Sequence, residues 1–277
     1  MSADPGNRLV SGRALETTAT LLACAVIIVP IYWILSNGFK SLVDVFALKW
    51  VFTPTLENFQ RIFAAPFDIG QKLLNSAIVS LLAVAIAIPV ATLAAYAFSR
   101  FALRGARALV LAIVFSQFIP PVVIVLPYFV LFRDLGLYDT RIGLALIELA
   151  LVTPFAVLML KSYIDQIPRE IEEAAVMDGA TRLRIIADIV APLAAPGIIT
   201  AALLCFILTW NDFLFALILT SKDAVTLPVG LAMFGGEEGV LWHLISAGGT
   251  LLMIPMLVLS IRIQKYYLEG TIAGANK

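Results

Sequence analysis

Charge is scarce in this chain of 277 residues: Asp, Glu, Lys and Arg together make up 14% of it. Soluble domains carry about 25% of such residues, and the mean hydropathy here is +0.98. A water-soluble fold is therefore excluded, and the sequence predicts an all-α polytopic membrane protein. The formal net charge is zero, which argues against a nucleic-acid partner.

Catalytic and metal-binding motifs are absent as well. The sequence contains no GxxxxGK[ST] phosphate-binding loop, no HExxH, no CxxC and no nucleophile elbow. Cys24 and Cys205 lie inside apolar runs, so we interpret them as small buried hydrophobic residues. His243, the single histidine, lies at the edge of an apolar run and is interpreted as an interfacial polar residue. We therefore expect no enzymatic activity, no metal and no bound cofactor in this chain itself.

Six apolar segments are each long enough to cross a bilayer, which takes roughly 20 helical residues. They cover residues 17–36, 73–99, 108–132, 142–160, 197–220 and 243–263. Pro120-Pro121 must kink or unwind the third, because proline removes helical hydrogen bonds. The expected organisation is an N-terminal segment 1–16, a transmembrane domain 17–265 and a C-terminal tail 266–277. Residues 1–36 could also form a peripheral first helix.

An even number of spans puts both termini on the same side of the membrane. With cytoplasmic termini, the inner segments hold 12 of the 19 Lys and Arg residues and the outer loops hold 7. Basic residues concentrate in cytoplasmic loops, so the sequence predicts that both termini are cytoplasmic. The charged segment between the fourth and fifth spans then lies in the cytoplasm too.

That charged segment, residues 168–197, reads PREIEEAAVMDGATRLRIIADIVAPLAAPG. It predicts two short helices joined at Asp178-Gly179, because glycine accepts the left-handed conformation that ends a helix. Thr181 can cap the second helix, and Pro192 and Pro196 close it. We therefore expect a cytoplasmic helical hairpin over residues 168–192.

Several polar residues lie inside the predicted spans, where they are costly and usually face a bundle interior or a water-filled path. They are Gln117, Glu148, Asn211 and Asp212, with Trp210 beside the last two. Amides and carboxylates suit the hydroxyls of a sugar, and aromatic rings can stack on its faces. The aromatic candidates are Trp210, Phe118, Tyr128 and Phe213. The alternative is that the polar groups only hydrogen-bond between helices and hold the bundle together.

The hairpin resembles the "EAA" loop of membrane permeases in binding-protein-dependent ABC importers. The resemblance rests on Glu173-Ala174-Ala175, then Gly179 after three residues, Ile189 after nine more, and Ala191-Pro192. The family usually has Leu where Ala191 stands, a mild change at an apolar position.

Three further stretches are similar to the carbohydrate-uptake branch of the family, of the maltose-transporter type. They are QFIPP at 117–121, WNDFLFAL at 210–217 and GTIAGANK at 270–277. Relatives often have Glu where Asp212 stands, and the tail has Thr-Ile where they have Leu-Thr. The resemblance identifies the chain as a member of the smaller, six-span permeases, with the type I ABC importer fold.

The resemblance implies a multi-pass permease of a prokaryotic plasma membrane that forms half of a sugar pathway. Its partners would be a second homologous permease, two cytoplasmic P-loop ATPases that bind ATP and Mg, and an extracytoplasmic sugar-binding protein. The hairpin would couple the permease to an ATPase, and the tail would dock between the two ATPases. The implied coupling residues are Glu173, Ala174, Ala175, Asp178 and Gly179, and the implied docking residues are Gly270 and Gly274.

Other functions stay open. The hairpin alone also fits an importer of polyamines, amino acids or phosphate, although the fifth-span and tail motifs favour sugar. A secondary transporter or channel is disfavoured by the short chain and by a hairpin that has no use there. A membrane scaffold without transport is disfavoured by the charged Glu148 and Asp212 inside the spans.

Overall fold

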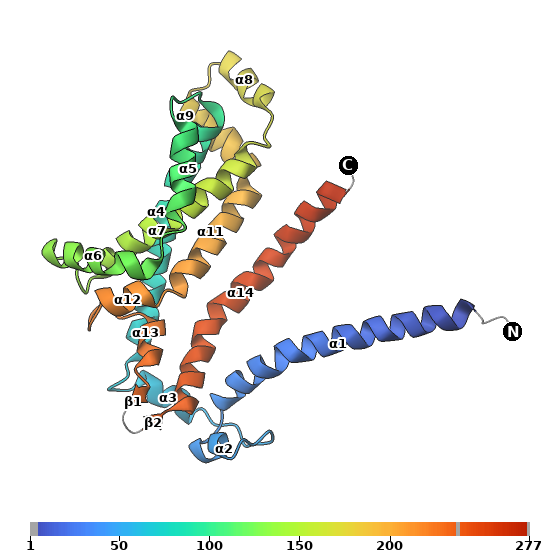
Figure 1. Ribbon diagram of the computed structural model, residues 1–277, viewed down its shortest axis with the longest axis vertical. Coiled ribbons are helices and arrows are strands. Elements are labelled where there is room, and N and C mark those ends of the chain that lie inside the picture. The colour runs from blue at the N-terminus through green and yellow to red at the C-terminus, as the bar shows by residue number, and fades with distance from the viewer. Residues whose placement is uncertain (1–4, 237–238, 276–277) are drawn as a thin grey trace. The chain divides into compact units, whose positions relative to one another are not determined.

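The computed structural model describes residues 5–236 and 239–275, which are almost entirely helical (Figure 1). The chain divides into two compact units, each described here by itself: Met1–Asp68 with Met233–Leu251, and Ile69–Ala232 with Leu252–Lys277. The elements in the first unit are α1 (Pro5–Asn37), α2 (Leu42–Phe46), α3 (Glu57–Phe63), β1 (Gly235–Gly236) and β2 (Gly239–Val240). The last helix, α14 (Trp242–Ala275), begins in the first unit and ends in the second.

The first unit is built around the long helix α1 and a polar turn that follows it. The part of α1 long and apolar enough to cross a membrane is Glu16–Asn37, and within it only Ser36 and Asn37, at its end, are buried within the structure. After the helix, the Asn58 amide donates to the carbonyls of Gly38 and Lys40 at 2.9 and 2.8 Å. Burial of the Lys40 ammonium lowers its pKa, and the ring of Trp33 lies 3.8 Å from it. These contacts tie the turn to the end of α1.

The second unit contains all the residues that the sequence singles out for function, apart from His243 and Cys24. Its elements are α4 (Ile69–Arg100), α5 (Ala106–Ser116), α6 (Pro121–Asp134), α7 (Arg141–Ile164), α8 (Arg169–Met177), α9 (Arg182–Ile185), the π-helix η1 (Ile186–Val190), α10 (Ala191–Leu193), α11 (Ala195–Trp210), α12 (Leu214–Leu219) and α13 (Leu227–Ala232). The centre of the unit is a bundle of α4, α7 and α11. Small residues permit close packing there, because Ala87, Ala91 and Ala95 of α4 are fully buried one helical turn apart.

The third predicted span is broken rather than merely kinked. α5 and α6 meet at an angle of 96°, at the Pro120-Pro121 pair that the sequence marks as a weak point (Figure 1). α5 has 11 residues and is therefore about 17 Å long, whereas the hydrocarbon core is about 30 Å thick. The prediction that Pro120-Pro121 kinks or unwinds the third span is therefore confirmed, and the helix pair is a broken span or a re-entrant loop.

The fifth predicted span is also interrupted. The run Arg182–Leu193 turns by 81° into α11, whose second residue is Pro196. α11 then ends at Trp210, and α12 begins only at Leu214. Residues 197–220 are thus two helices around a gap at Asn211–Phe213 rather than one. With the four continuous helices Glu16–Asn37, Ile69–Arg100, Arg141–Ile164 and Trp242–Ile261, the chain has up to six spans if each bent pair counts as one.

Most of the predicted C-terminal tail, residues 266–277, belongs to the last helix. α14 continues through Gly270 and Gly274 to Ala275. A glycine costs only about 1 kcal/mol within a helix, which a long, continuous helix tolerates. Residues 276 and 277 lie outside the described part of the chain.

Candidate functional site

The predicted hairpin is present, at one end of the second unit (Figure 1). α8 ends at Met177 with Asp178 as its C-cap, and Gly179 follows with φ +81°, the left-handed conformation that the sequence predicts. The N–H groups of Gly179 and Ala180 donate back to the carbonyls of Val176 and Ala175, each at 3.0 Å. The Thr181 hydroxyl then accepts from the Arg184 N–H at 3.4 Å and caps α9. The turn is therefore fixed by its own hydrogen bonds.

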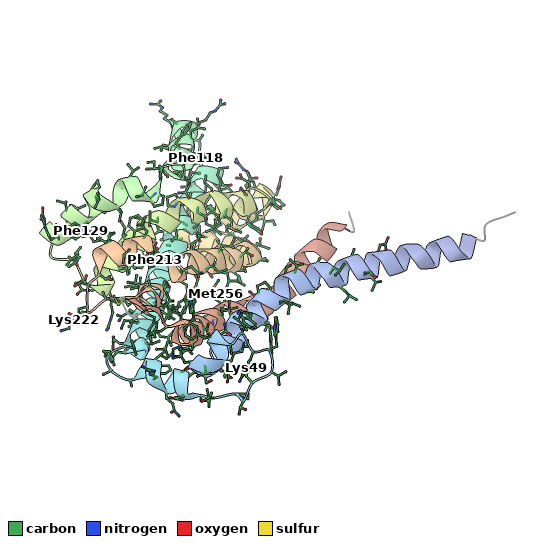
Figure 2. The ribbon with its side chains drawn as sticks, turned by 60° about the horizontal axis from the view of Figure 1, so that its bottom comes forward. Lys49, Phe118, Phe129, Phe213, Lys222 and Met256 are labelled. Carbon is green, nitrogen blue, oxygen red and sulfur yellow. The ribbon has the colours of Figure 1, made fainter. Side chains whose placement is uncertain are left out.

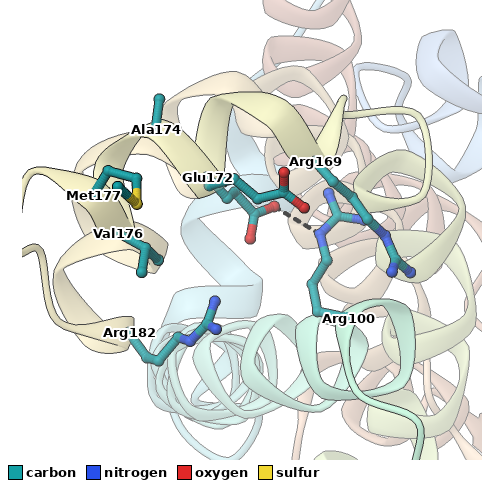
Figure 3. A pocket seen from close by; sticks show the side chains of 8 residues that line it. Arg100, Arg169, Glu172, Ala174, Val176, Met177 and Arg182 are labelled. Atoms are coloured by element: carbon teal, nitrogen blue, oxygen red, sulfur yellow. Dashed lines mark hydrogen bonds and ion pairs between the residues drawn. The ribbon is translucent and has the colours of Figure 1, made fainter.

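A buried ion pair fastens the hairpin to the membrane helices (Figure 3). Arg100 Nε, at the end of α4, donates to Glu172 Oε1 at 2.6 Å, and the two side chains are only 7% and 4% exposed. The Tyr96 hydroxyl donates to the other Glu172 oxygen at 2.8 Å. Arg100 Nη2 also donates to the carbonyls of Ile164 and Ile167, at 3.0 and 2.9 Å. One guanidinium thus joins α4, the end of α7 and α8.

A second set of bonds closes the same joint. Ser99 Oγ donates to Asp165 Oδ1 at 2.6 Å, and Arg169 Nη2 donates to the Ser99 carbonyl at 2.9 Å. Burial raises the pKa of the Asp165 carboxyl, but hydrogen bonds from Lys161 and Ser99 and the charge of Arg100 outweigh it, so the pKa is lowered. Asp165 is therefore an anion at neutral pH. The base of the hairpin is fixed by several compensated charges.

The predicted coupling residues lie beside this joint, mostly on its open side. Glu173, Ala174, Asp178 and Gly179 are exposed, whereas Ala175 is half-buried against the core of the bundle. A cavity of about 500 Å³ opens here, lined by Arg100, Arg169, Glu172, Glu173, Ala174, Val176, Met177 and Arg182 (Figure 3). The sequence reasoning missed Glu172. The signal available was the pair Tyr96 and Arg100, one turn apart at the end of a span.

A second cavity, of about 340 Å³, lies where both broken helices face α7. Its lining is Ser116, Gln117, Ile119, Pro121, Ile124, Glu148, Leu151, Val152, Leu208, Asp212, Leu214 and Phe215. Three of the five predicted pathway residues, Gln117, Glu148 and Asp212, therefore share one cavity although they come from three separate segments. We call it the membrane cavity.

The two carboxyl groups of the membrane cavity are neighbours that interact electrostatically. Glu148 lies on α7 and is 3% exposed. Asp212 Oδ2 accepts from the Ala216 N–H at 3.0 Å and so holds the start of α12. The gap between α11 and α12 therefore presents a carboxyl group to the same cavity as α7.

The other two predicted pathway residues turn away from this cavity. Trp210 is 3% exposed, and its Nε1 donates to the Leu252 carbonyl of α14 at 3.1 Å. The Asn211 amide donates to the Ile207 carbonyl at 2.8 Å and contacts the sulfur of Met256 at 3.9 Å. Both therefore make the helix-to-helix contacts that the sequence analysis held as the alternative. None of the aromatic candidates lines the cavity; Phe118 is 76% and Phe213 41% exposed (Figure 2).

A third feature ties two loops at the end of the unit opposite the hairpin. Asp139, at the start of α7, accepts from the backbone N–H groups of Ser221, Lys222, Asp223 and Ala224, at 3.0 to 3.2 Å. Burial raises the pKa of Asp139, but these four N–H donors outweigh it, so the pKa is lowered. Nearby, Arg141 Nε donates to Asn75 Oδ1 at 2.7 Å. No pattern in the sequence signals this tie, because its donors are backbone groups that every residue type carries.

The predicted docking residues, Gly270 and Gly274, lie on the last part of α14. The side-chain environment of residues 262–277 lies outside the described part of the chain. Their role stays a prediction.

Helices that cross a membrane, a charged helical hairpin at one end and a polar cavity between broken helices together define the architecture of a transport permease. Residues 87–271 match the family described as binding-protein-dependent transport system inner membrane component. The chain belongs to this family, and the resemblance drawn from its motifs is confirmed. It is thus a multi-pass permease subunit of a binding-protein-dependent transport system.

Curated relatives span the whole chain. The sulfoquinovosyl glycerol transport system permease protein of Agrobacterium fabrum is 34% identical, covering 100% of this chain and 99% of its own. The trehalose transport system permease protein of Mycobacterium tuberculosis is 36% identical, covering 90% and 92%. The trehalose/maltose transport system permease protein of Thermococcus litoralis is 31% identical, covering 96% and 97%.

Solved structures agree on the fold. A chain of a bacterial ABC transporter involved in the import of the acidic polysaccharide alginate has a TM-score of 0.79 at 23% identity, covering 96% of this chain and 99% of that one. A second alginate transporter structure, in complex with a pentasaccharide-bound periplasmic protein, gives 0.67 at 18% identity, covering 91% and 93%. The predicted fold, that of an ABC importer permease, is confirmed.

Proposed function

We propose that this permease imports a sugar and forms half of an ATP-driven translocation pathway, with a second homologous permease as the other half. Two cytoplasmic P-loop ATPases bind ATP and Mg and drive the cycle, and an extracytoplasmic binding protein delivers the sugar. The relatives named for trehalose, maltose and sulfoquinovosyl glycerol support a sugar. This chain itself carries no P-loop, so ATP hydrolysis falls to the partners.

The observation that carries the proposal is the continuous connection from the exposed hairpin to the membrane cavity. The exposed face of α8 is available to an ATPase, and Glu172 and Arg100 fix α8 to α4 and to the end of α7. Glu148, at the cavity, lies on that same α7. A push on the hairpin therefore moves the helix that walls the cavity, which is the lever that a coupled transporter needs.

The direct test is uptake by the complete importer, reconstituted in proteoliposomes with its ATPases and its binding protein. The panel is trehalose, maltose and diacetylchitobiose against putrescine, an amino acid and phosphate. We expect ATP-dependent, binding-protein-dependent uptake of at least one sugar. Uptake of a non-sugar solute alone would favour the alternative importer class, and uptake without ATP would indicate a secondary transporter.

The proposal includes cytoplasmic termini and a cytoplasmic hairpin. Met177 on the hairpin is 87% exposed, and Lys222 lies exposed in the opposite loop (Figure 2). Single cysteines at these positions, with Cys24 and Cys205 replaced by alanine, should differ in labelling. A membrane-impermeant thiol reagent on intact cells should label position 222 only, and position 177 should react after permeabilisation. The opposite pattern would overturn the orientation.

The proposal also has the end of α14 docking between the two ATPases through Gly270 and Gly274. Deleting residues 271–277 removes none of the predicted spans. We expect the assembled complex to lose part of its uptake or of its stimulated ATPase activity. Wild-type values for both would mean that the end of the chain is passive.

A further inference from the structure

The membrane cavity is large enough and polar enough to hold a small solute. Its volume of about 340 Å³ falls within the range of small-molecule pockets, about 300–1,000 Å³. Most of its lining is apolar, with Ser116, Gln117, Glu148 and Asp212 as the polar members. Gln117 is exposed, and its side-chain amide makes no hydrogen bond within the described residues, so it is free to bind a ligand. Such a mixture suits a sugar ring.

The ionisable residues that line the cavity are all acidic. Two of its lining residues are acidic, and none is Lys, Arg or His. Of the two basic residues on the same helix, Arg141 lies seven positions from Glu148, about 10 Å along the axis, and its Nε is held by Asn75. Lys161 lies thirteen positions away, about 20 Å along the axis, and is paired with Asp165. The cavity thus contains carboxyl groups with no cation of its own to balance them.

The two carboxyl groups share one small cavity. Two carboxylates so close together would repel each other, which favours a single negative charge on the pair. Asp212 already accepts the N–H of Ala216, which favours the anion, whereas Glu148 is 3% exposed within an apolar helix face. Glu148 therefore carries the proton and Asp212 the charge, leaving one net negative charge at the cavity wall.

We propose that Glu148 and Asp212 act as a charge filter, so that the membrane cavity admits uncharged or amine-bearing sugars and rejects acidic ones. This inference rests on the proposed sugar import and names the class of sugar. A carboxylate or sulfonate on the substrate would meet the Asp212 charge in a water-poor space with no counter-ion, where electrostatic interactions are weakly screened. An amine or a hydroxyl would instead find an acceptor. This preference for uncharged or amine-bearing sugars depends on the side chains of Glu148 and Asp212 and not on the backbone fold.

The charge is tested without any substrate by reagents that differ in sign. A single cysteine replaces Ser116, which lines the cavity, in a chain with Cys24 and Cys205 changed to alanine. The reassembled importer is treated either with the cationic reagent 2-(trimethylammonium)ethyl methanethiosulfonate or with the anionic 2-sulfonatoethyl methanethiosulfonate. The rate of cysteine modification by the cationic reagent is divided by the rate for the anionic one. The same ratio measured on free 2-mercaptoethanol gives the intrinsic reactivity of the two reagents. Dividing the two rates removes any effect of the cavity on the thiolate fraction.

We expect the cation-to-anion ratio at position 116 to exceed that of free thiol at least tenfold. Glu148→Gln with Asp212→Asn keeps the shapes and the acceptor for Ala216, and should reduce the excess to about twofold or less. Asp134→Asn removes an exposed negative charge that does not line the cavity and should change nothing. A ratio equal to that of free thiol, or an excess that survives the double substitution, would overturn the proposal.

The consequence for transport is measured with a matched pair of probes, maltose and its acid derivative maltobionate. For each probe, the uptake rate of the doubly substituted importer is divided by the uptake rate of the wild-type importer, which cancels the preference of the binding protein for one probe. We expect this quotient to be at least tenfold higher for maltobionate than for maltose. Equal quotients for the two probes would contradict the proposal. If neither probe is carried, sugar import itself is in doubt, while the thiol ratio still decides the charge of the cavity.

Discussion

The hairpin joint and the membrane cavity lie on the same bundle but treat charge in opposite ways. At the joint, Arg100 and Glu172 are both buried, and their polar atoms are bonded to each other, to Tyr96 and to carbonyls. At the cavity, Glu148 and Asp212 face each other with no cation among the lining residues. A buried charge that is paired with an opposite charge and fully hydrogen-bonded makes a rigid joint. A buried charge without a cation beside it interacts instead with the charge of a solute that enters the cavity. Under the functions proposed above, the joint would transmit force and the cavity would select the solute.

The largest effect should follow from breaking the joint. Arg100→Met leaves the buried Glu172 carboxylate without its cation, which costs about 3–5 kcal/mol. We expect a large fall in the thermal unfolding temperature of the purified permease and little protein in the membrane. Arg184→Met is the control, because its pair with Asp188 is 74% and 61% exposed and worth about 0.3–0.5 kcal/mol.

The double variant Arg100→Met, Glu172→Met sharpens this test, since it removes both charges. It should recover part of the lost stability, but not all, because the carbonyls of Ile164 and Ile167 lose their donor. If Arg100→Met is no more harmful than Arg184→Met, the ion pair does not hold the hairpin in place.

A smaller effect, confined to coupling, should follow at the tip of the hairpin. Gly179 has φ +81° and no neighbour within 4 Å of an added Cβ, so a side chain there meets strain but no clash. Gly179→Val should cost about 1–2 kcal/mol and lower ATP-driven uptake about tenfold, with the protein still present in the membrane. The measurement is uptake per assembled complex in proteoliposomes.

Gly136→Val is the matched control for Gly179→Val. Gly136 has φ +69° and equally open surroundings, but it lies near Asp139, away from the hairpin. It should impose a similar strain with a much smaller loss of uptake. Equal losses at the two glycines would show that strain alone, and not coupling, explains the effect.

An effect confined to one pair of loops is expected around Asp139. The lowered pKa of Asp139 means that its contribution to stability is complete above the ordinary value of 3.8 and is lost as the pH falls through the folded value below it. Asp139→Asn should speed hydrogen exchange at the Ser221–Ala224 amides by about tenfold between pH 5 and 8, since a charged acceptor is worth about 1.5–3 kcal/mol. The difference from the native chain should begin to fall below pH 3.8 and should vanish only below the lowered pKa of the folded state. A constant difference at all pH values would assign the effect to shape instead of charge.

The smallest effect separates two amides that the sequence treats alike. Gln117 lines the membrane cavity, whereas Asn211 bonds to the Ile207 carbonyl of its own helix. Alanine at position 117 should raise the KM for the transported sugar several-fold, and alanine at position 211 should leave it within about twofold. The reverse order would place the pathway on the other side of the gap between α11 and α12.

Local features of the hairpin were predictable because they depend on neighbours in the chain. Gly179 adopts the left-handed turn and Thr181 caps α9, as the residue types at those positions require. The apolar stretches gave the positions of the spans, because a bilayer demands length and composition and little else. The motif at Glu173 gave the family for the same reason: its residues are close together in the sequence.

Side-chain partners that are distant in the sequence were not predictable. Glu172 and Glu173 are adjacent and chemically identical, and only the packing of α8 on α4 decides that Glu172 is buried against Arg100, 72 residues away. In the same way Asn211 and Asp212 are neighbours, but the break after Trp210 turns one toward Met256 and the other toward Glu148.

The sequence by itself thus determined the class of protein, the apolar spans and the helical hairpin, because hydrophobicity and turn chemistry act over a few residues. It marked Pro120-Pro121 as a weak point, but only the tertiary structure decided that the helix turns there by 96°. A proline removes a hydrogen bond, and the surrounding helices decide how far the freed backbone bends. The membrane cavity exists because two such breaks meet opposite one face of α7, which no local pattern specifies.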